Sequence, residues 1–160
     1  MGNQLAVGLG EIKISREPQD LLIAYGLGSC MGIGIYDPVA HIAGLLHAIL
    51  PVYPGSGDST AKYVDTGVPQ LVDMLVKAGA IRSRMIVRMA GGAKMLVAPG
   101  FTNAFDIGSR NIDAANKTLA HMNLKLLGYE VGGNTGRTIR LYVNDGRMTI
   151  RTVGNQERAI

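Results

Sequence analysis

A glycine-rich hairpin places the strongest constraint on how this chain can fold. Residues 30 to 36 alternate apolar side chains with glycine, Asp37-Pro38 opens a turn, and residues 41 to 50 return as a second apolar stretch. The hairpin holds the only cysteine of the chain, Cys30, and one of its three histidines, His47. With the turn centred after Pro38, antiparallel pairing places Cys30 opposite His47 on one face of the pair.

A thiol opposite an imidazole is a candidate catalytic pair. Directly opposed residues have Cβ atoms roughly 4.5 to 5.5 Å apart, which is within hydrogen-bonding reach for these two side chains. A neighbouring imidazolium lowers the pKa of a thiol and makes the thiolate a nucleophile at neutral pH. The turn Gly26-Leu27-Gly28-Ser29 leaves the backbone N–H of Cys30 free to face an oxyanion. These features favour a cysteine hydrolase.

The same residues also fit a purely structural interpretation. A lone cysteine in an apolar strand is usually an inert, buried side chain, and a shift of one residue would put Cys30 and His47 on opposite faces. Gly32 and Gly34 argue against this, because glycine weakens a strand unless a backbone or a ligand must approach closely. The sequence therefore predicts that a ligand or a chain segment lies against the Cys30 face. The opposite face, with Met31, Ile33 and Ile35, is expected to point into the core.

Several short motifs in the same order resemble the chemoreceptor glutamine deamidase family, CheD, of bacterial and archaeal chemotaxis. The resemblance covers nearly the whole chain. It is carried by Leu27-Gly28-Ser29-Cys30, Asp37-Pro38, Gly44-Leu45-Leu46-His47, Leu50-Pro51, Lys62-Tyr63-Val64-Asp65, Ala90-Gly91-Gly92-Ala93, Ile107-Gly108-Ser109-Arg110-Asn111 and Gly132-Gly133-Asn134-x-Gly136-Arg137.

The resemblance implies roles for individual residues. Cys30 would be the nucleophile, His47 the acid and base, and glutamine side chains of chemoreceptors the substrate. The third catalytic member of the family is a threonine six residues before the cysteine, and this chain has Ala24 there. Without that hydroxyl, a backbone carbonyl, Tyr25 or water is expected to orient His47.

The remaining periodicity predicts an α+β fold, with packed β-sheets in a sandwich-like arrangement and two main helices on an outer face. Residues 1 to 160 are expected to form one domain. Phe101 and Phe105 are either core side chains or a partner-binding patch, and the tail after Gly154 is expected to fray. The predicted helices are 62–77, interrupted or kinked by Pro69, and 109–122, capped by Ser109. The predicted strands are 3–9, 12–14, 21–25, 84–90, 123–131, 138–143 and 147–153.

Composition limits the possible classes of protein. With 47% hydrophobic and 18% charged residues the chain is globular, and a single cysteine cannot form an internal disulfide, so a reducing cytoplasm is expected. The apolar run from Leu21 to Tyr36 contains four glycines and is shorter than the roughly 20 residues that a membrane helix needs, so no membrane insertion is expected. The net charge of +4 favours acidic partners, but the scattered basic residues do not indicate nucleic-acid binding. No dinucleotide, P-loop or metal-ligand spacing occurs, so no cofactor is expected.

Three functional hypotheses follow from the sequence. The first is a protein-glutamine amidohydrolase that acts on the cytoplasmic helices of chemoreceptors. The second is a non-catalytic binding module that regulates a CheC-type chemotaxis phosphatase, a partner implied by the resemblance, docking through residues 54 to 59 and the segment from Phe101 to Phe105. The third is a cysteine hydrolase for an unrelated small amide or ester.

Overall fold

The computed structural model describes residues 2–57, 59–95 and 106–160, and within these residues ten strands form two five-stranded sheets. Sheet A has the strand order β1-β3-β8-β9-β10, and sheet B has the order β2-β5-β4-β6-β7. The strands are β1 (Gln4–Ala6), β2 (Ile12–Ser15), β3 (Leu21–Leu27), β4 (Met31–Asp37), β5 (Ile42–Ala48), β6 (Ile86–Gly91), β7 (Lys125–Val131), β8 (Arg137–Tyr142), β9 (Met148–Thr152) and β10 (Arg158–Ala159).

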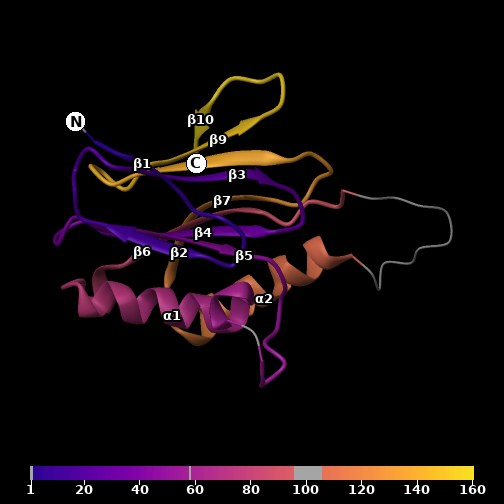
Figure 1. The fold of residues 1–160 in the computed structure, drawn as a ribbon, viewed down its shortest axis with the longest axis horizontal. Helices are drawn as coiled ribbons and strands as arrows, with labels where there is room; N and C mark the ends of the chain where they lie inside the picture. The colour runs from indigo at the N-terminus through magenta and orange to yellow at the C-terminus, as the bar shows by residue number, and fades with distance from the viewer. Residues whose placement is uncertain (1, 58, 96–105) are drawn as a thin grey trace, which may run out of the picture.

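The two sheets stack on one another, and both α-helices cover the outer face of sheet B (Figure 1). Helix α1 (Val64–Lys77) packs mainly against β5, and helix α2 (Ile107–His121) packs against β4, β7 and α1. Two 3₁₀ turns, η1 (Thr60–Lys62) and η2 (Arg82–Arg84), flank α1. The predicted α+β class, with layered sheets and two helices on an outer face, is confirmed. None of the helices among the described residues is both long and apolar enough to cross a membrane.

Strand β4 lies at the centre of sheet B and all of its residues are buried. Met31, Ile33 and Ile35 belong to the core between sheet B and the helices, as predicted. Gly32 and Gly34 face sheet A instead, where a Cβ built on Gly34 would lie 2.6 Å from Cε of Met148 and a Cβ on Gly32 would overlap Cδ1 of Ile139. The close approach that these glycines permit along β4 is therefore sheet-to-sheet packing, and the group that lies against this face is a chain segment, the side chains of β8 and β9.

The register of the β4–β5 hairpin differs from the predicted one by two residues. Gly32, and not Cys30, is opposite His47, because the connection between the strands spans residues 38 to 41. Such a loop suits a proline at its first position, and it closes with His41 in the left-handed region at φ 55° and a 2.8 Å bond from His41 N to Asp37 O. A shift of two residues keeps the side-chain alternation, so Cys30 and His47 still share a face.

Three further predictions about the elements need correction. Helix α1 is continuous through Pro69, so Pro69 does not begin a second helix, and α2 is capped by Asp106, whose carboxylate accepts from the backbone N–H of Ser109 at 3.0 Å. The tail is not frayed, because β10 pairs with β9 through Arg158 and Ala159. The buried faces predicted for residues 138–143 and 147–153 are confirmed. Phe101 and Phe105 lie outside the described residues.

Candidate active site

Cys30 and His47 lie at one end of the layer between the two sheets. Cys30 comes directly before β4, is partly exposed, and packs against the apolar cluster that fills this layer. His47 is near the end of β5, on the same strand face as Ala43 and Leu45 of that cluster, and is only 5% exposed. With Gly32 opposite His47, Cys30 is the diagonal neighbour of His47, and diagonal neighbours have Cα atoms roughly 7–8 Å apart.

A backbone carbonyl orients the imidazole of His47. Nδ1 of His47 lies 3.0 Å from the carbonyl oxygen of Val7, which can only accept a hydrogen bond. Nδ1 therefore carries the proton, and Nε2 is left with a lone pair. Nε2 is buried and has no hydrogen-bond partner among the described residues. A buried nitrogen with an unused lone pair can accept a proton from a neighbouring thiol.

The segment from Val7 to Glu11 holds the backbone of His47 in place. Gly10 N donates to His47 O at 2.8 Å, and His47 N donates to Glu11 O at 3.0 Å. Burial lowers the pKa of His47, against the opposing effects of the Val7 carbonyl and the charge of Glu11. The imidazole is therefore neutral at physiological pH, which is the protonation state that a general base requires.

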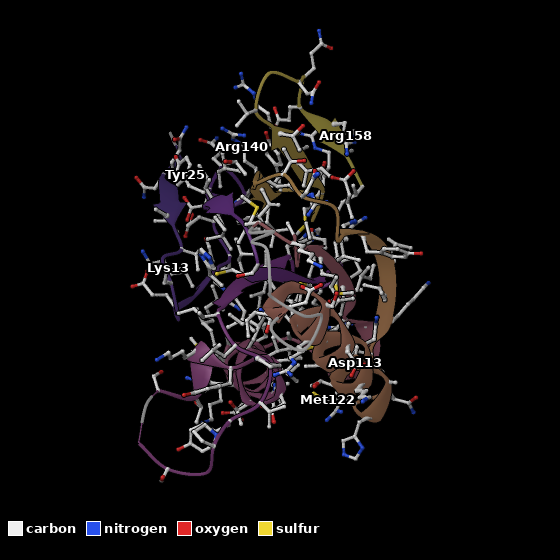
Figure 2. All side chains as sticks on the ribbon, turned by 90° about the vertical axis from the view of Figure 1, so that its right-hand side faces the viewer. Lys13, Tyr25, Asp113, Met122, Arg140 and Arg158 are labelled. Carbon is white, nitrogen blue, oxygen red and sulfur yellow. The ribbon has the colours of Figure 1, made fainter. Side chains whose placement is uncertain are left out.

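Ala24 is next to this anchor. Strand β1 pairs with β3 in parallel, and Val7 N donates to Ile23 O at 2.7 Å, so Val7 is beside Ala24 at the end of the pairing. Ala24 is fully buried in the layer between the sheets, on the side where His47 lies. Tyr25 is 56% exposed and points away from that layer, as Figure 2 shows for its labelled side chain. The sequence left open which group orients the imidazole of His47. The carbonyl of Val7 lies within hydrogen-bonding distance of that ring, and Tyr25, which points away from it, is excluded.

The turn that carries Cys30 is held by the strand end of β6. Ala93 N donates to Gly28 O and Gly92 N donates to Cys30 O, both at 2.9 Å. Gly91 has φ 121°, and a Cβ there would overlap the carbonyl oxygen of Cys30. A glycine is therefore required at position 91, because only glycine allows the two backbones to approach so closely.

The free thiol is a neutral group in this environment. Burial raises the pKa of Cys30, and a hydrogen bond with its own backbone N–H only partly opposes this effect. The thiolate–imidazolium pair expected from the sequence is therefore not the resting state. Neutral thiol and neutral imidazole are the forms that precede a proton transfer from Sγ to Nε2. The described residues include no group of three or more His, Cys, Asp or Glu side chains able to hold a metal ion.

Comparison with known proteins agrees with the motifs. The family model described as CheD chemotactic sensory transduction matches residues 49–152. A probable chemoreceptor glutamine deamidase CheD of Symbiobacterium thermophilum is 44% identical over 97% of this chain and 96% of its own length. The chemoreceptor glutamine deamidase CheD of Thermotoga maritima is 36% identical over 95% of this chain and 94% of its own, and a probable one from Methanococcus vannielii is 40% identical over 98% and 99%. The chain therefore belongs to the CheD family.

Proposed function

We propose that this chain deamidates glutamine side chains on the cytoplasmic helices of chemoreceptors and so converts them to glutamate. The observation that carries the proposal is the buried Nε2 of His47, which has no hydrogen-bond partner in the described part of the chain and lies in the layer against which the thiol of Cys30 packs. Relatives that align over nearly the full length are named as chemoreceptor glutamine deamidases, which supports the choice of substrate.

The proposed reaction has two stages that share one proton carrier. Nε2 of His47 takes the thiol proton of Cys30 while Sγ attacks the carboxamide carbon of glutamine, and the resulting imidazolium protonates the leaving nitrogen as the C–N bond breaks. Ammonia leaves and a thioester remains. Water then attacks the thioester, His47 takes a proton from that water and returns it to Sγ, and the products are glutamate and the free thiol.

The negative charge on the carboxamide oxygen needs a donor during both stages. We assign this role to the backbone N–H of Cys30, and a preorganised N–H of this kind is worth several kcal/mol in other hydrolases. Because the Gly28–Cys30 turn is held at two carbonyls by Gly92 and Ala93, this N–H is fixed before substrate arrives. The absent hydroxyl at Ala24 leaves the scheme intact, since the Val7 carbonyl occupies Nδ1 of His47.

The partners proposed are the chemoreceptor as substrate and a CheC-type phosphatase as regulator. The phosphatase rests on the family resemblance alone, and two parts of its expected docking surface, residue 58 and the segment from Phe101 to Phe105, are outside the described residues. A purely non-catalytic role was motivated by the missing hydroxyl at position 24. The bond from His47 Nδ1 to the Val7 carbonyl supports the catalytic role instead, because it orients the ring without that hydroxyl.

The test is incubation of the protein with a chemoreceptor cytoplasmic fragment that carries glutamines, followed by mass spectrometry. The wild-type chain is expected to raise the fragment mass by about 1 Da per converted glutamine and to release ammonia in equal amount. Cys30→Ala is expected to reduce the rate by at least about 1,000-fold. His121→Ala, which changes an exposed histidine of α2, is the matched control and should act like wild type. Conversion by Cys30→Ala at the wild-type rate would exclude the proposed nucleophile.

A further inference from the structure

Asn111 of α2 is fully buried and hydrogen-bonded to both strands of the candidate site. Its Nδ2 donates to the carbonyl oxygen of Ser29 at 2.8 Å and to that of Ile49 at 2.9 Å. Ser29 directly precedes Cys30, and Ile49 is two residues after His47. One side-chain amide thus joins the segment that carries the thiol to the segment that carries the imidazole.

This bridge lies where the two strands separate. The last backbone pair of the β4–β5 hairpin is Met31 with Ala48. Beyond it, Ile49 N donates to Lys62 O at 2.8 Å, while Cys30 O accepts from Gly92 N. The two backbones therefore turn to different partners, and the Nδ2 group of Asn111 donates a hydrogen bond to each of them. The side chain of Asn111 therefore links the two segments beyond the last backbone pair of the β4–β5 hairpin.

Helix α2 packs closely against the segment that follows β6, and this packing fixes the position of the Asn111 amide. A Cβ on Gly108 would lie 2.5 Å from the carbonyl oxygens of both Gly92 and Ala93, so the first turn of α2 touches the same backbone that holds the Cys30 turn. Asn111 follows less than one helical turn later. The position of its amide relative to Cys30 is therefore set by backbone contacts on two sides.

We propose that Asn111 is a positioning residue for the Cys30–His47 pair, because its amide sets how far the two strand ends separate and hence the distance from Sγ to Nε2. The inference rests on the proposed function, and Asn111 itself touches no reacting atom. Removing the amide takes away the donor that the carbonyl oxygens of Ser29 and Ile49 share and lets the strand ends move apart. Proton transfer and attack need a separation of about 3–3.5 Å, and an error of 1 Å costs about 100-fold in rate.

The test compares Asn111→Ala with Asn116→Ala, which changes an exposed asparagine on the same helix. Asn111→Ala is expected to lower kcat for deamidation by about 10-fold to 100-fold. It should change KM by less than about threefold, because Asn111 is buried and its replacement leaves the surface of the chain unchanged. Asn116→Ala is expected to match wild type in both. Asn111→Asp keeps the side-chain volume, removes both N–H donors and should show the same loss in kcat. Any variant that melts near the assay temperature is measured about 15 °C below its melting point, beside wild type.

A second readout does not depend on deamidation. Cys30 is the only thiol, so its alkylation by iodoacetamide reports its reactivity alone. In the wild-type background, His47→Gln should slow alkylation by about fivefold or more, whereas in the Asn111→Ala background the same change should alter the rate by less than about twofold. An unchanged effect of His47→Gln in that background would overturn the inference, as would wild-type kcat in Asn111→Ala. If the alkylation rates of these variants follow the expected pattern but the wild-type chain does not deamidate receptors, the positioning role of Asn111 stands and the proposed function fails.

Discussion

His47→Gln is expected to lower kcat for deamidation by about 100-fold to 10,000-fold while leaving the fold intact. A glutamine amide can still donate to the Val7 carbonyl, so the hydrogen bond that holds the ring has a replacement. It has no nitrogen lone pair to take the proton of Cys30 or to return it to the leaving group. The measurement is steady-state ammonia release, with His121→Gln on the exposed surface of α2 as the control. A kcat within about threefold of wild type would show that another group carries the proton.

The same variant is expected to change how stability depends on pH. Burial lowers the pKa of His47 in the folded chain, and the unfolded chain keeps the ordinary value of 6.5. Between these two values the unfolded state binds more protons, so the free energy of unfolding falls as the pH falls below 6.5. His47→Gln should flatten this decrease, and denaturant unfolding at pH 5 and pH 7.5 measures it. A decrease of equal size in wild type and variant would contradict the pKa assignment.

Asp37→Ala is expected to lower the free energy of unfolding by about 3–5 kcal/mol. The carboxylate of Asp37 is fully buried, and it accepts from Arg84 Nε at 3.1 Å and from Arg84 Nη2 at 2.9 Å. It also accepts from the backbone N–H groups of Val39, Ala40 and Ile81 at 2.9, 3.1 and 2.8 Å. One side chain therefore closes the hairpin loop and fastens it to the segment before β6, and its loss leaves several donors without a partner.

Urea unfolding at pH 7 measures this effect, and Asp113→Ala is the matched control. Asp113 pairs with Lys117 on the exposed face of α2, with side chains 64% and 77% exposed, so its loss should leave the midpoint unchanged within error. Burial opposes ionisation of Asp37, but the bonds from Arg84 and the three backbone groups outweigh it and hold the pKa of Asp37 well below its usual range. Its contribution is therefore complete above the ordinary aspartate pKa of 3.8 and is lost as the pH falls. Equal midpoints for the two variants would contradict the role of Asp37.

The side-chain alternation of the hairpin was sufficient to predict that Cys30 and His47 share a face. Alternation depends only on strand character and on the parity of the register, and both were correct. The register itself was wrong by two residues, because it depends on the loop, where Asp37 binds two backbone N–H groups and His41 adopts a left-handed conformation. Local sequence does not specify a loop length when several lengths are compatible with a proline after Asp37.

The groups that contact the site residues could not be predicted from the sequence, because they depend on the tertiary structure. Gly32 and Gly34 correctly indicated a close approach, but the approaching group is sheet A, and which element packs there depends on the tertiary structure. The anchor of His47 is the carbonyl of Val7, and any residue type at position 7 would offer one. Asn111 did carry a signal, since it belongs to a motif of the family resemblance, but only the fold shows that its amide spans two strand ends.

Acid quenching during turnover shows whether Cys30 forms a covalent intermediate with the substrate glutamine. Wild-type chain is mixed with excess receptor fragment, quenched within the first turnover, and measured by intact mass and by mass spectrometry of the peptide that contains Cys30. We expect an adduct with the mass of both chains less one ammonia, attached at Cys30 and absent from Cys30→Ala. A fragment with glutamate in place of every modified glutamine should give no such adduct. Deamidation at the wild-type rate by Cys30→Ala, with no adduct on the wild-type thiol, would show that Cys30 is not the nucleophile.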